Sequence, residues 1–357
     1  MIDTIKISVE RFKIENPCLF VLNNSNRTLN DVIEELQTKV YTNKIPMHYS
    51  HLKPINDGMY RPRIEYTINP YVNTLLYIEF SVPKLLFGNN LHEVREKDFE
   101  DVITVLHDIL KELQIKVSKY ELMNAVVRKV HYSKNFILDK ELECRDVFNL
   151  FKLTRYNYAG SLEDYIENKA IQVRNNTFAI SMYNKISEII DTDDIIDSKI
   201  VDNYKNRIFR LEFKFENPDD NKKLAHNILE LSRDTKLKFK DVFKEDSFKK
   251  VFYDGLNKLN KHMPKIVYSK NVIEDLERIS CNFDELAKRN LFVSYQQKYG
   301  NYNEAIRKIQ ESVSVSDNVI KKFKTFLTDK EKLKTIVSDF LEEIKDYTPI
   351  QEKLNNN

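Results

Sequence analysis

Four segments of the chain alternate apolar and polar residues, and each carries a titratable side chain near the middle of its polar side. The four residues are Glu79, His131, Tyr183 and Glu212, in the segments 75–82, 129–133, 178–185 and 208–215. A period of two is typical of a β-strand with one buried face. If the four strands share one sheet, these side chains would converge on a single surface.

Such a set of side chains suits phosphoryl-transfer chemistry. Glu79, His131 and Glu212 would supply carboxylate oxygens and an imidazole nitrogen to a Mg²⁺ or Mn²⁺ ion. The Tyr183 hydroxyl is a candidate nucleophile. Its reference pKa of about 10 means that it needs activation by a metal, by a base or by Lys185. The alternation places Lys185 on the same side, where it would stabilise a phenolate or the charge on a reacting phosphate.

The same alternation also fits a sheet whose polar face only meets solvent. Antiparallel sheets routinely keep one face on the core and one in water. Cross-strand Glu/Lys and Glu/Arg pairs are ordinary on such faces. In that interpretation the protein is a structural or interaction protein. The enzyme interpretation requires Tyr183 within a few ångströms of Glu212, and near His131 or Glu79 on the same face.

The composition excludes several classes of protein. The 357 residues include 57 Lys and Arg against 55 Asp and Glu, so the chain is not globally basic. There are five glycines and no GxGxxG, GxxxxGK(S/T) or GxSxG pattern, which argues against a phosphate-cradling loop and a serine hydrolase. Three separated cysteines without a CxxC pair predict a cytoplasmic protein. No apolar run approaches the ~20 residues of a membrane span.

The elements that must hold these residues follow from periodicity. Predicted strands cover 2–14, 59–68, 73–82, 125–138 and 207–216 with a hairpin at 155–186, an Asn69-Pro70 turn and an acidic insert at 188–197; predicted helices cover 28–40, 97–115 and 142–153. We therefore expect an α+β domain over 1–217, with an antiparallel sheet and packed helices. A mostly α-helical DNA-binding or accessory domain is expected over 218–350, and a frayed tail at 351–357.

Basic residues gather in one part of the chain. Residues 199–270 contain 18 Lys and Arg against 11 Asp and Glu, and 236–252 interleaves lysines with phenylalanines. This segment predicts either DNA binding, with lysine on phosphates and Phe stacking or packing, or an amphipathic helix with Phe in the core and Lys in water. The candidate DNA-binding residues are Lys129, Arg210, Lys214, Lys236, Lys238, Lys240, Lys249 and Lys250. A capped turn at 314–317 is reminiscent of a helix-turn-helix.

Several segments resemble, in order, the gene II-type replication initiators of filamentous phages and related phage and plasmid rolling-circle replication proteins. The matching segments are MIDTIKI, MHYSHLK, IEFSVPKLLFGNN, RKVHYSKNF, NTFAISMYNKISE and FRLEFKFE. They include the family's strand followed by Pro-Lys and Gly-x-Asn, its Tyr-x-Lys strand and its Arg-x-Glu strand. The resemblance covers about residues 1–220.

The resemblance implies an endonuclease that nicks one strand of a double-stranded origin through a tyrosine and later rejoins the ends. Tyr183 and Lys185 match the Tyr-x-Lys positions, Glu212 matches the family's carboxylate, and Glu79 precedes the Pro-Lys signature. Many relatives have an acidic residue where this chain has His131. The implied partners are origin DNA, the displaced single strand, and a host helicase and polymerase in the cytoplasm of a bacterial cell. A non-catalytic origin-binding protein of the same descent is the alternative.

Overall fold

The computed structural model describes eleven stretches of the chain. These are residues 1–16, 20–22, 48–52, 60–68, 75–152, 161–166, 170–174, 179–192, 197–232, 235–261 and 332–355. They fall into two compact units, of which the first comprises 1–145, 158–255 and 344–357, and the second 146–157 and 256–343. The described parts of the second unit are helical: the end of α5, the end of α10 and residues 332–343.

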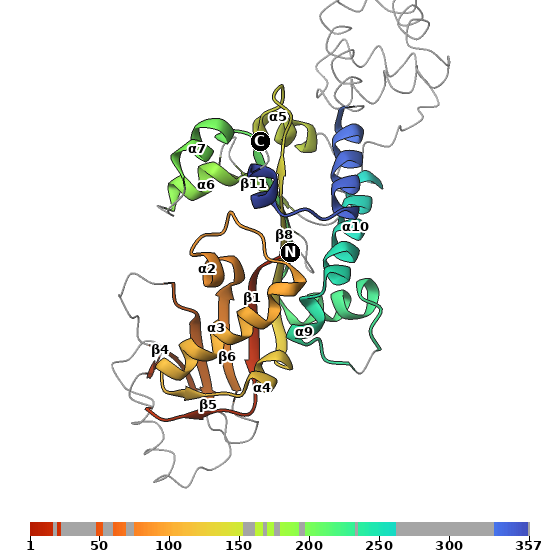
Figure 1. The fold of residues 1–357 in the computed structure, drawn as a ribbon. Coiled ribbons are helices and arrows are strands. Elements are labelled where there is room, and N and C mark those ends of the chain that lie inside the picture. The colour runs from red at the N-terminus through yellow and green to blue at the C-terminus, as the bar shows by residue number, and fades with distance from the viewer. Residues whose placement is uncertain are drawn as a thin grey trace, which may run out of the picture. The chain divides into compact units, whose positions relative to one another are not determined.

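The first unit is built on a mixed α+β fold with a large antiparallel sheet (Figure 1). Among the described residues, ten strands follow one another in the order β3-β4-β5-β6-β1-β8-β12-β11-β10-β9. Their bounds are β1 Ile2–Val9, β3 Phe20–Leu22, β4 His48–Leu52, β5 Arg63–Ile68, β6 Leu75–Ser81, β8 Val126–Ile137, β9 Ser161–Ile166, β10 Ala170–Arg174, β11 Ala179–Asn184 and β12 Ile208–Phe215. A small second sheet pairs β2 Lys13–Ile14 with β7 Ile115–Lys116.

The helices of the described chain are mostly short. They are α2 Val82–Phe87, η2 Glu96–Asp98, α3 Phe99–Glu112, α4 Lys119–Met123, α5 Cys144–Lys152, α6 Lys185–Asp191, α7 Ser198–Tyr204, α8 Pro218–Lys223, the π-helix η3 Leu224–Ile228, α9 Phe239–Val242, α10 Glu245–Lys261 and α15 Ile350–Asn355, with a further helix over 332–345. None of these helices is long and apolar enough to cross a membrane.

The core lies between the apolar face of the sheet and these helices. Alternate residues of the central strands are buried, such as Ile5 in β1, Ile78 in β6 and Leu211 in β12. α3 lies across β1, β5 and β6 in Figure 1, and its predicted apolar stripe is buried from Val102 to Leu110. The opposite face of the sheet carries the polar residues of the same strands, because successive side chains point to opposite faces.

The segment after β6 has a local structural explanation. Ser81 caps α2 by accepting a hydrogen bond from the Lys84 amide, and Pro83 occupies the first turn, where no amide donor is needed. Gly88 ends the helix in the left-handed conformation at φ 73°. The residues that carry part of the family resemblance, the Pro-Lys and Gly-x-Asn signature, thus also form a capped helical turn.

The α+β class and the antiparallel sheet are confirmed, but several predicted boundaries are wrong. Residues 218–255 belong to the first unit rather than to a separate domain, because their Phe side chains fill the core of the sheet. The expected tail at 351–357 includes most of α15, whose Ile350 is fully buried. The acidic insert begins as helix α6, the 155–186 region holds three strands, and the first predicted strand breaks after Val9.

Other predictions fall outside the described residues. These are the helix at 28–40, the turn at Asn69-Pro70 and the turn at 314–317. Most of the expected helical region also lies there, since 262–331 is not described.

Candidate active site

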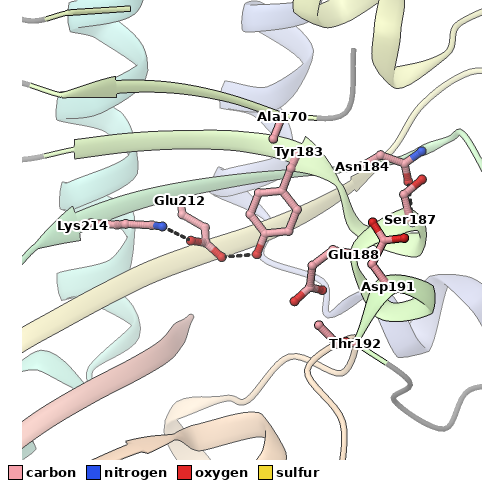
Figure 2. Close-up of a pocket in the computed structure, with 9 residues that line it drawn as sticks. All are labelled: Ala170, Tyr183, Asn184, Ser187, Glu188, Asp191, Thr192, Glu212 and Lys214. Carbon is pink, nitrogen blue, oxygen red and sulfur yellow. Dashed lines mark hydrogen bonds and ion pairs between the residues drawn. The ribbon is translucent and has the colours of Figure 1, made fainter. Parts of the chain in front are cut away.

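Two neighbouring strands bring Tyr183 and Glu212 together on the polar face. β11 and β12 pair antiparallel, with Ser181 opposite Glu212 and Tyr183 opposite Arg210. Tyr183 and Glu212 are therefore diagonal neighbours, a relation that long side chains bridge easily. The Tyr183 hydroxyl donates a hydrogen bond to Glu212 Oε1, as Figure 2 shows. The contact between Tyr183 and Glu212 that the enzyme interpretation requires is present.

Arg210 binds the Glu212 carboxylate of this pair, and only 1% of the surface of Arg210 is exposed. Its Nε donates to Glu212 Oε1 at 2.8 Å, and its Nη2 lies 2.6 Å from Asp3 and 2.8 Å from Ser133 Oγ. Its Nη1 donates to the Asn90 carbonyl at 2.8 Å. A guanidinium so buried and so fully bonded offers no donor to a DNA phosphate. Arg210 therefore orients Glu212, and its prediction as a DNA-binding residue is corrected.

The pKa values of the two hydrogen-bonded groups are shifted in opposite directions. Burial raises the pKa of the Tyr183 hydroxyl well above 10, and Glu212 adds to that rise while Arg210 opposes it. Burial alone would also raise the pKa of Glu212, but Lys214, Arg210 and His131 and the bond from Tyr183 lower it well below 4.5. At neutral pH the pair is thus a neutral phenol and a carboxylate. The bond orients the hydroxyl without removing its proton.

Lys185 lies beside Tyr183, though not as a strand residue. β11 ends at Asn184, whose side chain caps α6, and Lys185 is the first residue of that helix. Its Nζ lies 2.5 Å from Glu188 and 5.8 Å from the centroid of the Tyr183 ring. Burial, assisted by repulsion from Arg210, lowers the pKa of Lys185 to about 8. The ammonium group is therefore close to losing its proton under mildly alkaline conditions.

A pocket of about 360 Å³ opens next to the Tyr183–Glu212 pair. Figure 2 shows its lining residues, which come from β10, β11, β12 and α6. They are Ala170, Tyr183, Asn184, Ser187, Glu188, Asp191, Thr192, Glu212 and Lys214. Lys214 lies on the far side of Glu212 from Tyr183, with its Nζ 3.3 Å from Glu212 Oε2. A phosphodiester entering here would meet a tyrosine hydroxyl, a carboxylate and an ammonium group.

The predicted metal ligands do not assemble into one site. β1 lies between β6 and β8, and there Thr4 pairs with His131 while Lys6 pairs with Glu79. Glu79 instead accepts a hydrogen bond from Lys129 at 2.8 Å. Lys6, the partner of Glu79, lies two residues along β1 from Thr4, the partner of His131. Glu79 and His131 are therefore separated both along the strands and across them.

His131 and Glu212 do not make a preformed pair of ligands either. His131 Nε2 lies 3.4 Å from a carboxylate oxygen of Glu216, and both Glu212 oxygens are occupied by cations or by the phenol. Within the described stretches, no group of three or more His, Cys, Asp or Glu side chains could hold a metal ion. The three-residue set expected from the sequence therefore does not fit a bound ion as placed.

The predicted DNA-binding lysines divide into two groups. Lys129 and Lys214 pair with Glu79 and Glu212 on the polar face. The lysines of 236–252 lie at the surface of α9, α10 and the loop before them, Lys249 and Lys250 being paired along α10 with Glu245 and Asp246. The phenylalanines between these lysines are buried: Phe239, Phe243, Phe248 and Phe252. These rings therefore pack in the core and do not stack on DNA bases, and phosphate binding by the lysines stays a prediction.

Sequence reasoning missed Asp3, which pairs with Arg210. Asp3 is 8% exposed although it precedes the alternating part of β1. The pairing of β1 with β8 shifts register between Ile2 and Thr4. Such a bulge interrupts the alternation of side chains, so a strict period of two gave no signal for Asp3. Asn90 and Ser133 were missed because one contributes a carbonyl from a loop and the other only a hydroxyl.

A search against models of known protein families finds no match for this chain, and a search of curated proteins finds none either.

Proposed function

We propose that the chain is a DNA nicking and rejoining enzyme that uses Tyr183 as its nucleophile, as an initiator of rolling-circle replication does. The observation that carries this proposal is the hydrogen bond from the Tyr183 hydroxyl to Glu212, at the wall of an open pocket. A nucleophile bonded to a base that a third group orients is the usual arrangement of covalent catalysis. Arg210 is that third group here.

In the proposed step, Tyr183 Oη attacks the scissile phosphorus and its proton passes to Glu212. A tyrosine–5′-phosphate bond forms, the bond to the 3′ oxygen breaks, and that oxygen takes a proton from water. Glu212 then returns its proton to the solvent, which neutralises the hydroxide left behind. The reverse attack by a 3′ hydroxyl rejoins the strand. The phosphodiester energy is kept in the covalent intermediate, so neither step needs a nucleoside triphosphate. This agrees with the lack of a phosphate-cradling glycine loop in the sequence.

The charges around Glu212 support the proton transfer once DNA is bound. Without substrate, Lys214 and Arg210 hold the pKa of Glu212 well below 4.5, which makes it a weak base. A phosphodiester beside Lys214 competes for that cation and places a negative charge near the carboxylate. Both effects raise the pKa of Glu212. Lys214, which lines the pocket, would then face the growing charge on the transferred phosphate.

A divalent ion has no assigned role in the proposed step, and its requirement is tested by experiment. Mg²⁺ or Mn²⁺ would polarise the scissile phosphate in such chemistry. Because Glu79, His131 and Glu212 are placed apart or already paired, no step above is assigned to it. Origin DNA, the displaced strand, and a host helicase and polymerase are the partners that this function would require.

The first prediction concerns Tyr183→Phe, with supercoiled DNA that carries the cognate origin as substrate. We expect nicked circles and a protein–DNA adduct with the natural chain, in the presence of Mg²⁺ or Mn²⁺. The variant should lose at least about 10³-fold in nicking, since it lacks the nucleophile. Glu212→Gln should lose about 10²- to 10⁴-fold, the usual worth of a general base. Adducts are read on denaturing gels.

Tyr77→Phe is the matched control, because Tyr77 lies on the same face in β6 and outside the pocket. It should nick like the natural chain. Undiminished nicking and adduct formation by Tyr183→Phe would remove Tyr183 from the role of nucleophile. DNA binding without any nicking by the natural chain would favour the non-catalytic origin-binding protein. Equal activity with and without a chelator would remove the metal ion from the proposal.

A further inference from the structure

A second pocket of about 250 Å³ lies at the other end of the central strands. It is formed by the start of β8, the segment α8–η3 and the residues that precede α9. Four of its lining residues are basic or imidazole side chains: Arg128, Lys222, His226 and Lys236. No Asp or Glu belongs to the described lining. A pocket lined in this way attracts an anion.

The basic side chains are available at modest cost. Lys222 and Lys236 are exposed, with ion-pair distances of 3.2 Å to Asp219 and 3.8 Å to Glu10. Exposed ion pairs of this kind are worth about 0–1 kcal/mol, so an incoming anion can replace them. Arg128 is already oriented, since its Nε donates to Ser8 Oγ at 2.8 Å. The remaining donors of its guanidinium group can bind the anion.

One lining residue of the pocket, Asn221, carries a hydrogen-bond acceptor without a donor. Asn221 is 7% exposed, and its Nδ2 donates to the Arg128 carbonyl at 2.7 Å. Its Oδ1 is buried and has no hydrogen-bond partner among the described residues. A buried polar atom without a partner carries a free-energy penalty, which a bound N–H or O–H group would relieve. The pocket therefore suits a ligand with both an anionic group and a donor.

The backbone around the pocket is also irregular. His226 lies in the π-helix η3, a conformation found often at functional sites. Its Nδ1 lies 3.2 Å from the Leu231 carbonyl, which can only accept, so Nδ1 carries the hydrogen. Glu230, two residues after the end of η3, has a φ of 59° although it is not a glycine. Such strain persists only when the surroundings hold it in place.

We propose that this pocket binds one nucleotide of a DNA strand, with the phosphate at the basic rim and a base N–H at Asn221 Oδ1. Its apolar walls, including Val126 and Leu237, would face the sugar and the base. The identity of the ligand as DNA rests on the proposed function. Inorganic phosphate alone would pair with the basic side chains but would leave Asn221 Oδ1 without a hydrogen-bond donor.

The distance from the nicking site sets the expected register. Arg128 precedes Ser133 by five residues along β8, and Ser133 pairs with Glu212. At a rise of about 3.4 Å per residue, the pocket lies roughly 17 Å along the sheet from the Tyr183–Glu212 pair. A single strand that occupies both places must span this distance between the scissile phosphate and the second phosphate-binding position.

The test measures the binding of a fluorescent single strand of about 12 nucleotides, by anisotropy at several salt concentrations. The protein is the full chain with Tyr183→Phe, so that the strand is not cut. Adding Lys222→Gln and Lys236→Gln should weaken binding about 10-fold, and should lower the slope of log K against log salt by about 0.7 for each phosphate that is no longer neutralised. Thr235→Trp, which fills the pocket without a change in charge, should weaken binding as well.

The matched control carries Lys111→Gln and Lys140→Gln, two exposed lysines outside the pocket. It should lose less than about 2-fold. Equal losses in the pocket and control variants would overturn the proposal. So would thymidine monophosphate binding that depends on Lys222 and Lys236 while strand binding does not, because the pocket would then serve a free nucleotide.

A nicking assay on the Tyr183 form of each variant separates this inference from the proposed function. If the natural chain nicks DNA and the pocket variants bind the strand with unchanged affinity, the inference about the pocket is overturned and the proposed enzyme activity stands. Strand binding that depends on the pocket, without adducts from the natural chain, supports the pocket and overturns the enzyme.

Discussion

Lys185 is an uncommon lysine at the scale of single residues, because none of its side chain meets solvent. The Glu188 carboxylate lies 2.5 Å from its Nζ and Asp3 also favours its charge, whereas Arg210 repels it. Its charge is therefore maintained against the cost of burial. That cost is what a functional site tolerates when it needs a cation next to a tyrosine.

The pH dependence of stability tests this burial. The pKa of Lys185 is lowered from 10.5 to about 8 in the folded chain, so between these values the unfolded chain binds the extra proton. Stability then rises with pH across that window, by up to about 1.4 kcal/mol per pH unit. The free energy of unfolding of the natural chain should rise from pH 8 to 10 relative to Lys185→Met, as urea denaturation at each pH would measure.

Lys199→Met is the control for this comparison, since Lys199 is an exposed lysine of α7. Its side chain is solvated in both states, so its curve should run parallel to that of the natural chain. A difference between the natural chain and Lys185→Met that stays constant from pH 7 to 10 would contradict the lowered pKa.

At the scale of elements, the packing of α10 against β12 depends on the absence of a side chain. A Cβ at Gly255 would lie 2.2 Å from the Phe213 ring. Phe213 is 2% exposed and packs edge-on against Phe252, with 5.0 Å between ring centroids, so it has little room to move. The helix can approach the sheet this closely only with glycine at that position.

Gly255→Ala should therefore destabilise the protein, although alanine favours helices. Overpacking of a core costs about 1–3 kcal/mol, which exceeds the ~1 kcal/mol gain in helix propensity. Thermal or urea denaturation measures the change. Asn257→Ala, at an exposed position of the same helix, should stay within about 0.5 kcal/mol of the natural chain.

A second variant makes the cause of this effect clear. Phe213→Leu combined with Gly255→Ala should lose less stability than the sum of the two single changes, because the smaller side chain gives the methyl group room. Strict additivity would mean that the close approach of Gly255 to Phe213 is not the cause.

At the scale of the whole molecule, the segment 344–357 is tied to β8, far away in sequence. The fully buried Lys134 donates to Glu93 at 2.8 Å and to the Thr348 carbonyl at 2.9 Å. Glu93 also accepts from the amides of Asn135 and Ile350, at 2.6 and 3.1 Å. A single buried ion pair thus satisfies the backbone of two distant segments beside the strand that carries His131 and Ser133.

Lys134→Met should cost about 3–5 kcal/mol, because it leaves the Glu93 carboxylate buried without its cation. Lys249→Met removes one partner of a half-exposed pair with Glu245 on α10 and should cost less than about 1 kcal/mol. Chemical denaturation compares the two. Equal and small losses would show that the Glu93 charge is compensated by its amide donors alone.

Much of the site could be predicted from the sequence, because the direction of a side chain in a strand is a local property. Alternation placed Tyr183 and Glu212 on one polar face, and Ile78 and Leu211 on the core face. The helical periodicity of 97–115 likewise predicted the buried stripe of α3. Lys185 was placed near Tyr183, although it reaches that position from the first turn of a helix.

Only the tertiary structure decided which strands are neighbours, because pairing joins residues far apart in the chain. β1 enters between β6 and β8 and keeps Glu79 away from His131 and Glu212. A bulge in that strand brings Asp3 to Arg210, where no periodicity predicts it. Arg210 was expected to bind DNA, but it is buried and its guanidinium group orients Glu212 instead. Alternation determines the face on which a side chain lies, and non-local packing determines the partners that it meets there.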